Sequence, residues 1–556
     1  MYLNFKSIFS LDRNKGVTVK NIFFYFLICF LVFSFSIRTF QLDFRILAVY
    51  VLFLVVVNLL LFNTFLFRID KLLFLHSLFL ILLLIPMIIY AGGSGFYLSR
   101  DILPILKNGY FDSDTSFHVA IAESIKNYGY PSTLLHGNPV LNYHVGSHYL
   151  LALLSFISTI PIIELFPYQN SFFPLLFITY FLIFISSKVN RGLLAILSLF
   201  VFVILNNHEK FFWTFDISTP ISLFWSMLLI IRLSRKQSSD LVDYVLLALT
   251  FLCKVSVGVY LFGIYGVYRV IFFKKSILIR FARFSILLGL FMLLFYLTSD
   301  DFKRHSLHWE YGSLHKQLLD QEKRDVRIIA FFVLPSLLFF FSLVKKNWQL
   351  VTSCLGIILI SYLAINLSFD NRAHLHFIVG ANWITVFLFS GLRISNVRKT
   401  IYYIPLYICI SIFVLFNSPF IKQKMPIVID MKPQYPQKTN ADLYIQKLIE
   451  LRNRDEKFLI QIPEQETDFW NHWAHAAPSH SRYFMAFWIP MLSGKPAYNG
   501  YNSKFMKETS VGWYPPGTYG YSSYYNDSTG LKGFRKIIKL SKVEGKIVEE
   551  VIFFHH

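Results

Sequence analysis

The chain has 556 residues, of which 55% are hydrophobic and only 15% are charged, and its mean hydropathy is +0.52. A soluble domain carries about 25% charged residues and has too small a core to bury this much apolar surface, whereas a bilayer can accommodate it. The net charge of +21 comes from Lys and Arg in short clusters between apolar runs. That pattern follows the positive-inside rule of membrane proteins and lacks the interleaved aromatic residues of nucleic-acid binding.

Three transmembrane spans are predicted in residues 1–91. They correspond to apolar runs near 21–37, 46–66 and 72–91, and the segment before them is basic. This segment has no small-residue cleavage site, so we expect a retained first span and not a removed signal peptide. If the basic N-terminus is cytoplasmic, the polar stretch 92–145 lies outside the membrane.

The region 146–416 is predicted to be a transmembrane core with external loops. Basic clusters follow its apolar runs 219–231, 256–273, 327–344 and 376–392. All four clusters become cytoplasmic if 146–187 makes one net crossing, for example with 170–187 as a span and 146–163 as a re-entrant or shallow hairpin element. The alternative is that a short run elsewhere does not span. The total is about thirteen spans.

Residues 417–556 differ from the rest because they are rich in Pro, Gly, Tyr, Asn and Trp and contain no span. The stretch ADLYIQKLIELRNRDEKFLIQIP predicts a helix followed by a strand. The aromatic side chains could stack on sugar rings or form the core of a small domain. The predicted fold class is therefore mainly α, a polytopic transmembrane helical protein with a small α/β extracytoplasmic C-terminal domain.

The outer loop 92–145 carries the residues that suggest chemistry. Asp112 and Asp114 precede His118, and apolar residues recur at helical spacing through 115–127. Asp114 is expected near the N-cap of this helix, with His118 one turn later on the same side. Two carboxylates and a histidine at a membrane surface suit proton abstraction from a hydroxyl. The plainer alternative is an aspartate that only caps the helix and histidines that are only solvated.

Several stretches resemble the GT-C class of membrane glycosyltransferases, which take a sugar from a polyprenyl-phosphate carrier on the outer face of the membrane. FDSDTSFHVAIAESIKNYGYP, followed by LNYHVGSHYLLALLS, is similar to the acidic first external loop of that class. LLALTFLCKVSVGVYLF and FDNRAHLHFIVGANWITVFLFSGL look like its Lys-bearing span and its late Arg-bearing loop and span. The similarity extends over most of the chain from about residue 92, and two extra spans precede the span that leads to the acidic loop.

The resemblance implies an inverting transfer in which an aspartate is the general base. Asp114 would be that base, with Asp112 as second choice, and His118 and His144 would position the acceptor or the carrier phosphate. No residue is assigned as a metal ligand and no cofactor is expected beyond the lipid-linked sugar donor. A divalent cation that bridges the carboxylates to a phosphate is the alternative left open.

The same resemblance implies a phosphate-binding role for Lys254 and Arg372, the latter through a forked pair of hydrogen bonds. The alternatives are that Lys254 snorkels to the interface and that Arg372 forms a salt bridge with Asp370. The implied partners are a lipid-linked sugar, a glycan, lipid or protein acceptor, and membrane lipids.

The expected location is the bacterial cytoplasmic membrane, with the active site and the C-terminal domain extracytoplasmic. The nearest rival function is a polysaccharide polymerase or ligase that uses a lipid-linked glycan, for which the loop 299–326 supplies histidines. A flippase or transporter is less favoured because it should carry charges at mid-bilayer in several spans and little external mass.

Overall fold

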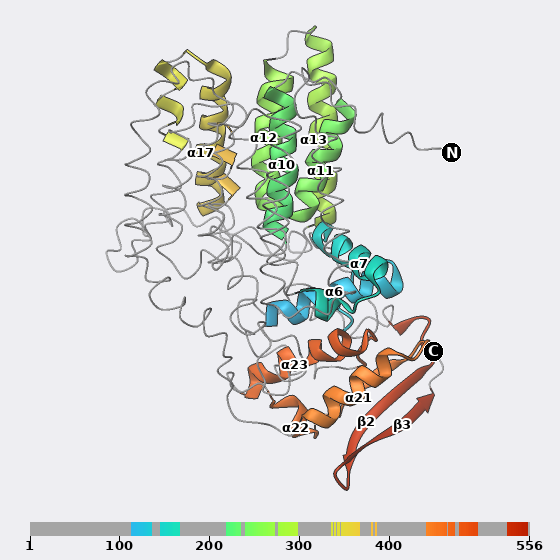
Figure 1. The fold of residues 1–556 in the computed structure, drawn as a ribbon. Coiled ribbons are helices and arrows are strands. Elements are labelled where there is room, and N and C mark those ends of the chain that lie inside the picture. The colour runs from blue at the N-terminus through green and yellow to red at the C-terminus, as the bar shows by residue number, and fades with distance from the viewer. Residues whose placement is uncertain are drawn as a thin grey trace, which may run out of the picture. The chain divides into compact units, whose positions relative to one another are not determined.

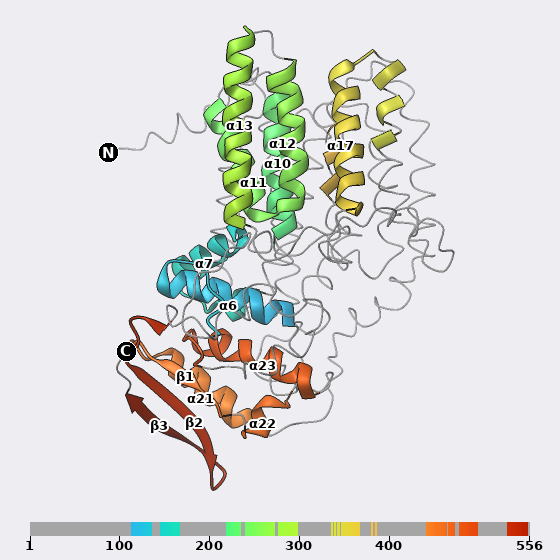
Figure 2. The same cartoon turned by 180° about the vertical axis from the view of Figure 1, so that it is seen from behind.

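We describe the fold from a computed structural model of the chain. The residues described are 113–135, 145–166, 218–234, 240–272, 276–298, 346–366, 441–463, 465–472, 478–498 and 531–553, with short pieces at 335–336, 338–340, 342–344, 380–381, 384–385 and 388. The chain divides into two compact units. The first contains the apolar helices of the middle of the chain, and the second contains the helices within 113–166 together with the helices and strands within 441–553 (Figures 1 and 2).

The first unit is a bundle of apolar helices. Its elements are α10 (Ser218–Ser234), α11 (Asp240–Cys253), α12 (Val255–Tyr265), the π-helical turn η2 (Gly266–Ile271), α13 (Ile277–Thr298) and α17 (Trp348–Asn366). Both views show α10, α12 and α13 running side by side. Aromatic rings join α13 to α11 and α12, since Phe291 of α13 packs edge-on against Phe251 of α11 and Phe262 of α12.

Helix α13 is the one helix in the described part of the chain that is both long and apolar enough to cross a membrane. Large apolar side chains such as Ile277 and Phe281 are exposed along it, as expected of a surface that faces lipid. The helices α10, α11 and α12 and most of α17 are apolar but shorter. The runs 21–37, 46–66 and 72–91 lie outside the described residues, so the count of about thirteen spans remains a prediction.

Helices α11 and α12 form a tight antiparallel hairpin joined at one residue, Lys254. The backbone of Lys254 is extended, at φ −153° and ψ 108°, and interrupts an otherwise continuous helical run. The two helices nearly touch, because a Cβ added to Gly258 would lie 2.7 Å from the Cα of Phe251. Glycine is needed here because any side chain would push α12 away from α11.

Ion pairs link the helices at the end of this bundle that is opposite Lys254. Asp243 at the start of α11 is buried and accepts from Arg232 at 2.7 Å and from Arg269 of η2 at 3.5 Å. The other end is marked by Ser222 of α10, which donates to the carbonyl of Thr250 at 3.0 Å. The three helices are therefore held at both ends, with charge pairing at one end and the Lys254 turn at the other.

The second unit has helices on one side of a small sheet. Its elements are α6 (Ser113–Tyr128), α7 (Gly146–Ser158), α21 (Asp442–Arg452), β1 (Leu459–Gln461), α22 (Thr467–Trp470), α23 (Pro478–Ser493), β2 (Lys536–Val543) and β3 (Lys546–Phe553). Contacts run in the order α7, α6, α23, α21 and sheet, as both views show. The outer-loop helix α6 thus belongs to the same compact unit as the C-terminal segment. The sequence predicts 92–145 and 417–556 as two separate regions.

Two predictions for local structure in this unit are confirmed. The amphipathic stretch 115–127 lies within α6, and the segment after residue 441 forms a helix and then a strand. The 13 residues of α7 give a helix of about 20 Å, shorter than the roughly 30 Å of a bilayer core. The left-handed backbone of Thr159, at φ 59°, ends it.

The sheet lies at the end of the second unit opposite α7. Strand β1 pairs parallel with β2, in the register Leu459 to Ile537, and β2 pairs antiparallel with β3. Leu459 and Ile537 form a small core with Leu531 and Phe534, against which Tyr128 of α6 packs. The described part of the protein is therefore mainly helical with one small sheet, as the sequence predicted at this level.

Candidate functional site

The first turn of α6 holds the proposed base. The helix begins at Ser113, so Asp114 is its second residue, where the free N–H groups and the helix dipole favour a carboxylate. His118 follows four residues later, and the backbone of α6 therefore puts positions 114 and 118 on one helix face. Asp112 lies outside the described residues.

His118 is bonded to a second histidine that the sequence did not single out. Its Nδ1 lies 2.8 Å from Nε2 of His148, which is fully buried in α7. One of these two nitrogens must carry the proton and the other must accept it. His148 Nδ1 also lies 3.4 Å from Ser147 Oγ. The ring of Phe166 stacks on His118 with centroids 6.4 Å apart, so the imidazole is held from two sides.

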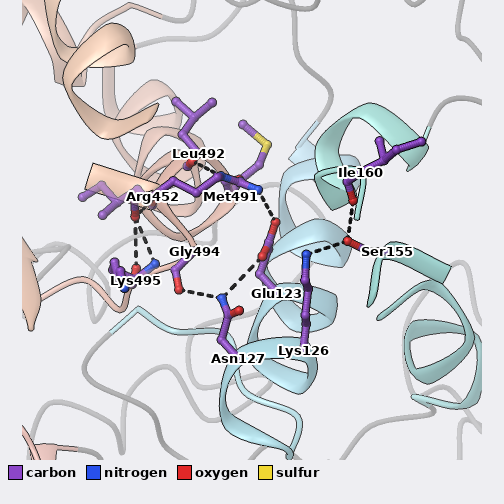
Figure 3. Close-up of polar contacts among 12 residues, drawn as sticks. Glu123, Lys126, Asn127, Ser155, Ile160, Arg452, Met491, Leu492, Gly494 and Lys495 are labelled. Carbon is purple, nitrogen blue, oxygen red and sulfur yellow. Dashed lines mark hydrogen bonds and ion pairs between the residues drawn. The ribbon is translucent and has the colours of Figure 1, made fainter. Parts of the chain in front are cut away.

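A buried ion pair fixes the middle of α6. Glu123 is 2% exposed, and its Oε1 accepts from Nη1 of Arg452 at 2.8 Å (Figure 3). Arg452 also donates from Nε to the carbonyl of Leu492 at 2.7 Å and from Nη2 to that of Met491 at 2.5 Å. These carbonyls are among the last of α23, where a cation is favoured by the helix dipole. One guanidinium therefore joins α21, α23 and α6.

Lys126 extends this network from α6 to α7. Its Nζ donates to Ser155 Oγ at 2.8 Å, and that hydroxyl donates to the carbonyl of Ile160 at 2.5 Å. Burial holds the pKa of the Lys126 ammonium below its ordinary value, despite the opposing charge of Glu123. Figure 3 shows Glu123 and Lys126 on the same stretch of α6. Glu123 is directed toward Arg452 of α21, and Lys126 is directed toward Ser155 of α7.

Gly494 lets the end of α23 approach α6 closely. Its φ is +64°, and a Cβ added there would lie 2.9 Å from Nδ2 of Asn127. That nitrogen donates to the Gly494 carbonyl at 3.0 Å and approaches Glu123 at 3.4 Å. The glycine is therefore required by both its backbone conformation and the contact.

Of the two basic residues expected to bind the carrier phosphate, Lys254 and Arg372, the structure describes Lys254. It occupies the turn between α11 and α12 and is 7% exposed. Gly380 packs against the first turn of α12, since a Cβ added there would lie 3.2 Å from the carbonyl oxygen of Ser256. Arg372 precedes this contact by eight residues and lies outside the described part, as does His144.

Two further expectations concern metals and sugar-stacking aromatics. Within the described ranges, no three His, Cys, Asp or Glu side chains converge as a metal site would require. Trp470 and Trp488 of the C-terminal segment are buried, so these two contribute to the core and not to an open sugar-binding surface.

His148, Glu123 and Arg452 are the residues of this arrangement that sequence reasoning did not select. His148 lies in the histidine-bearing stretch after α6, but its pairing with His118 spans 30 residues and a turn. Glu123 and Arg452 are 329 residues apart. In a helix Glu123 lies across from the stripe of Phe117 and Ile121 and shares its face with Val119 and Ala120, so the apolar spacing gave no signal for the ion pair.

Comparison with known proteins adds no relative: no family model, no curated protein and no solved structure matches this chain.

Proposed function

We propose that the protein is a polytopic membrane glycosyltransferase that moves a sugar from a polyprenyl-phosphate carrier to a hydroxyl of a cell-envelope glycan, lipid or protein. In this proposal the chain crosses the bacterial cytoplasmic membrane about thirteen times. The second unit lies on the outer face, where the lipid-linked donor and the acceptor are both available.

The observation that supports this proposal best is the anchoring of α6. A general base must reach the proton it removes at hydrogen-bond distance, and small displacements are costly in rate. The helix that carries Asp114 is fixed by the Glu123–Arg452 ion pair and by the bond from Lys126 to Ser155. A helix whose aspartate served only as a cap would not need buried charges to hold its position.

In the proposed reaction Asp114 removes the proton of the acceptor hydroxyl while the hydroxyl oxygen attacks the anomeric carbon. The bond from that carbon to the phosphate oxygen breaks, the electron pair leaves with the carrier phosphate, and the configuration inverts. His118, held by His148, positions the acceptor. Lys254 and Arg372 neutralise the charge that grows on the departing phosphate.

Sugar transfer by the purified full chain tests the proposal. A panel of polyprenyl-phosphate sugars is offered with the native protein, with Asp114→Asn, and with Asp468→Asn as a matched control. Asp468 is a half-exposed partner of Lys542 in the second unit, so its loss should leave transfer unchanged. Asp114→Asn should lower kcat by about 10²- to 10⁴-fold.

Two results would count against the proposal. If no lipid-linked sugar is turned over, the protein is not this enzyme. A polymerase or ligase would depend on the loop 299–326, which contains His305 and is followed directly by Arg327. If transfer survives Asp114→Asn but fails when His305 or Arg327 is replaced, the protein is a polymerase or ligase instead.

A further inference from the structure

We infer that strand β3 is a dimerisation edge, on which β3 of a second copy of the chain pairs antiparallel and joins the two sheets into one. The inference concerns the assembly of the protein and does not rest on the proposed activity. Four features of the hairpin formed by β2 and β3 lead to it.

The first feature is that one edge of the sheet is covered and the other is open. Beyond β1, the backbone of Ile460 donates to Pro496 at 2.9 Å and accepts from Tyr498 at 2.7 Å. Ala497, which lies between these two, donates to the carbonyl of Leu134 at 2.7 Å. On the other side β3 is the outermost strand, and no described segment pairs with its outer edge (Figures 1 and 2). An open edge is a template for a further strand.

The second feature is the set of backbone groups at that edge. Glu544 and Gly545 have φ of 49° and 77° and form the two-residue loop of a type I′ hairpin. In such a hairpin the residues that flank the loop exchange backbone hydrogen bonds, and pairs with and without such bonds alternate from there. The N–H of Lys542 fits this alternation, because it faces away from β3 and donates to Oε1 of Glu466 at 3.2 Å. The residues of β3 that direct N–H and C=O groups outward are therefore Ile547, Glu549, Val551 and Phe553.

The third feature is that β3 lacks the devices that usually keep an edge strand from pairing. Such strands are short, or carry proline, a bulge or lysines along the edge. Strand β3 has eight residues, KIVEEVIF, without proline, and it pairs with β2 in continuous register. Its lysine, Lys546, is its first residue. Val548 and Val551 are about half-exposed and Phe553 is 72% exposed, so pairing would also remove apolar surface from water.

The fourth feature is that the charges of β3 are balanced within its own protomer. Glu549 accepts from Lys447 at 2.7 Å and from Arg454 at 2.7 and 2.8 Å. Glu550 accepts from Lys539 at 2.8 Å. A basic strand from another protein would find both carboxylates already occupied. A second copy brings the same balanced pairs, so the charges favour a partner of identical sequence.

The register of the pair follows from these features. Outward groups must face outward groups, so the two-fold axis lies between a residue and its own copy. The longest overlaps are centred on Glu549 or on Glu550, and the second places more apolar residues opposite each other, which stabilises paired strands. On each side of that axis the apolar pairs are Ile547 with the partner's Phe553 and Val548 with the partner's Ile552. One strand edge is smaller than the roughly 800 Å² per partner of a standard interface, so we expect a weak dimer with a Kd of about 1–100 μM.

Disulfide trapping of the full chain in detergent micelles tests the inference. In the inferred register position 550 faces its own copy in a pair without backbone hydrogen bonds, where the Cα atoms lie about 4.5 Å apart. A disulfide needs about 4.4–6.8 Å between these atoms, so Glu550→Cys should give a reducible dimer under mild oxidation. Glu456→Cys is the matched control, because Glu456 is a similarly exposed carboxylate that pairs with a lysine, Lys536, outside β3. It should crosslink no more than the native protein.

A second measurement needs no added cysteine. Val551→Pro removes an outward N–H but leaves the bonds to β2, because proline is tolerated where an edge strand directs its N–H to solvent. It should raise the dimer Kd about tenfold or more in analytical ultracentrifugation. Val543→Lys is the control, since Val543 is also about half-exposed but lies outside the paired residues, and it should leave the Kd unchanged.

The inference is overturned if the native protein stays monomeric up to about 100 μM and Glu550→Cys crosslinks no more than Glu456→Cys. The edge would then be left to a strand of another protein. It is also overturned if Val543→Lys weakens association as much as Val551→Pro, because the contact would then be non-specific. Neither readout uses sugar transfer, so failure of the glycosyltransferase proposal would leave this result unaffected.

Discussion

Removing the guanidinium of Arg452 should release α6 from the rest of its unit. Arg452→Met keeps an unbranched apolar side chain but leaves the carboxylate of Glu123, 2% exposed, without its cation. It also removes the two bonds to the carbonyls of Met491 and Leu492. Breaking a buried pair by deleting one partner costs about 3–5 kcal/mol, and we expect a loss in this range.

The assay is hydrogen exchange of the amides of α6 in the full-length protein in detergent micelles. Local opening that becomes about 3 kcal/mol easier should speed exchange of these amides by more than about 100-fold. The double variant Glu123→Gln, Arg452→Met should recover part of the loss, because no charge is then left buried. Lys539→Met is the control, since its pair with Glu550 is exposed and such pairs contribute about 0–1 kcal/mol.

The reasoning is refuted if Arg452→Met leaves α6 exchange within about threefold of the native rate, well below the change a broken buried pair requires. It is also refuted if the double variant is as unstable as the sum of the two single ones, because then the two charges do not interact.

Three further predictions follow from individual contacts. Gly258→Ala should abolish the monodisperse folded protein in size-exclusion chromatography, because its Cβ would lie 2.7 Å from the Cα of Phe251; normal recovery would show that the hairpin can open. His148→Ala should lower kcat for sugar transfer by about tenfold with little change in the KM of the polyprenyl-phosphate sugar, and an unchanged kcat would make the pair with His118 purely structural. Burial raises the pKa of Glu549, but hydrogen bonds from Arg454 and Lys447 outweigh it and hold the pKa below its ordinary value. The stability advantage of the native protein over Glu549→Gln in urea unfolding should therefore be present at neutral pH and lost as the pH falls below about 4.3, and an advantage that persists in acid would contradict this.

Local structure in the second unit followed from sequence because it depends on short-range patterns. The spacing of Phe117, Ile121 and Ile125 identified α6, and the change from helical to strand spacing after residue 441 identified α21 and β1. Both patterns repeat within about ten residues, the range over which backbone geometry sets which side chains share a face.

The contacts that hold the candidate site could not be predicted from such short-range patterns, because they join residues that are far apart in the sequence. The bond between His118 and His148 needs α6 and α7 to pack, and the ion pair of Glu123 joins residues 329 positions apart. The break at Lys254 was also missed, because LCKVSVGV contains no proline and the glycine that permits the turn lies four residues later. The roles of all six candidate site residues remain predictions, and three of these residues, Asp112, His144 and Arg372, also lie outside the described part of the chain.

The long separation of Glu123 and Arg452 also sets an order of events during synthesis. At about 5–20 residues per second, the 329 residues between them take roughly 15–65 seconds to make. Throughout that interval the carboxylate of α6 has no guanidinium to bind and the end of α23 does not yet exist. The helix that carries Asp114 can therefore reach its final position only after the tail of the same chain has been produced, so a prematurely terminated product would lack an assembled centre.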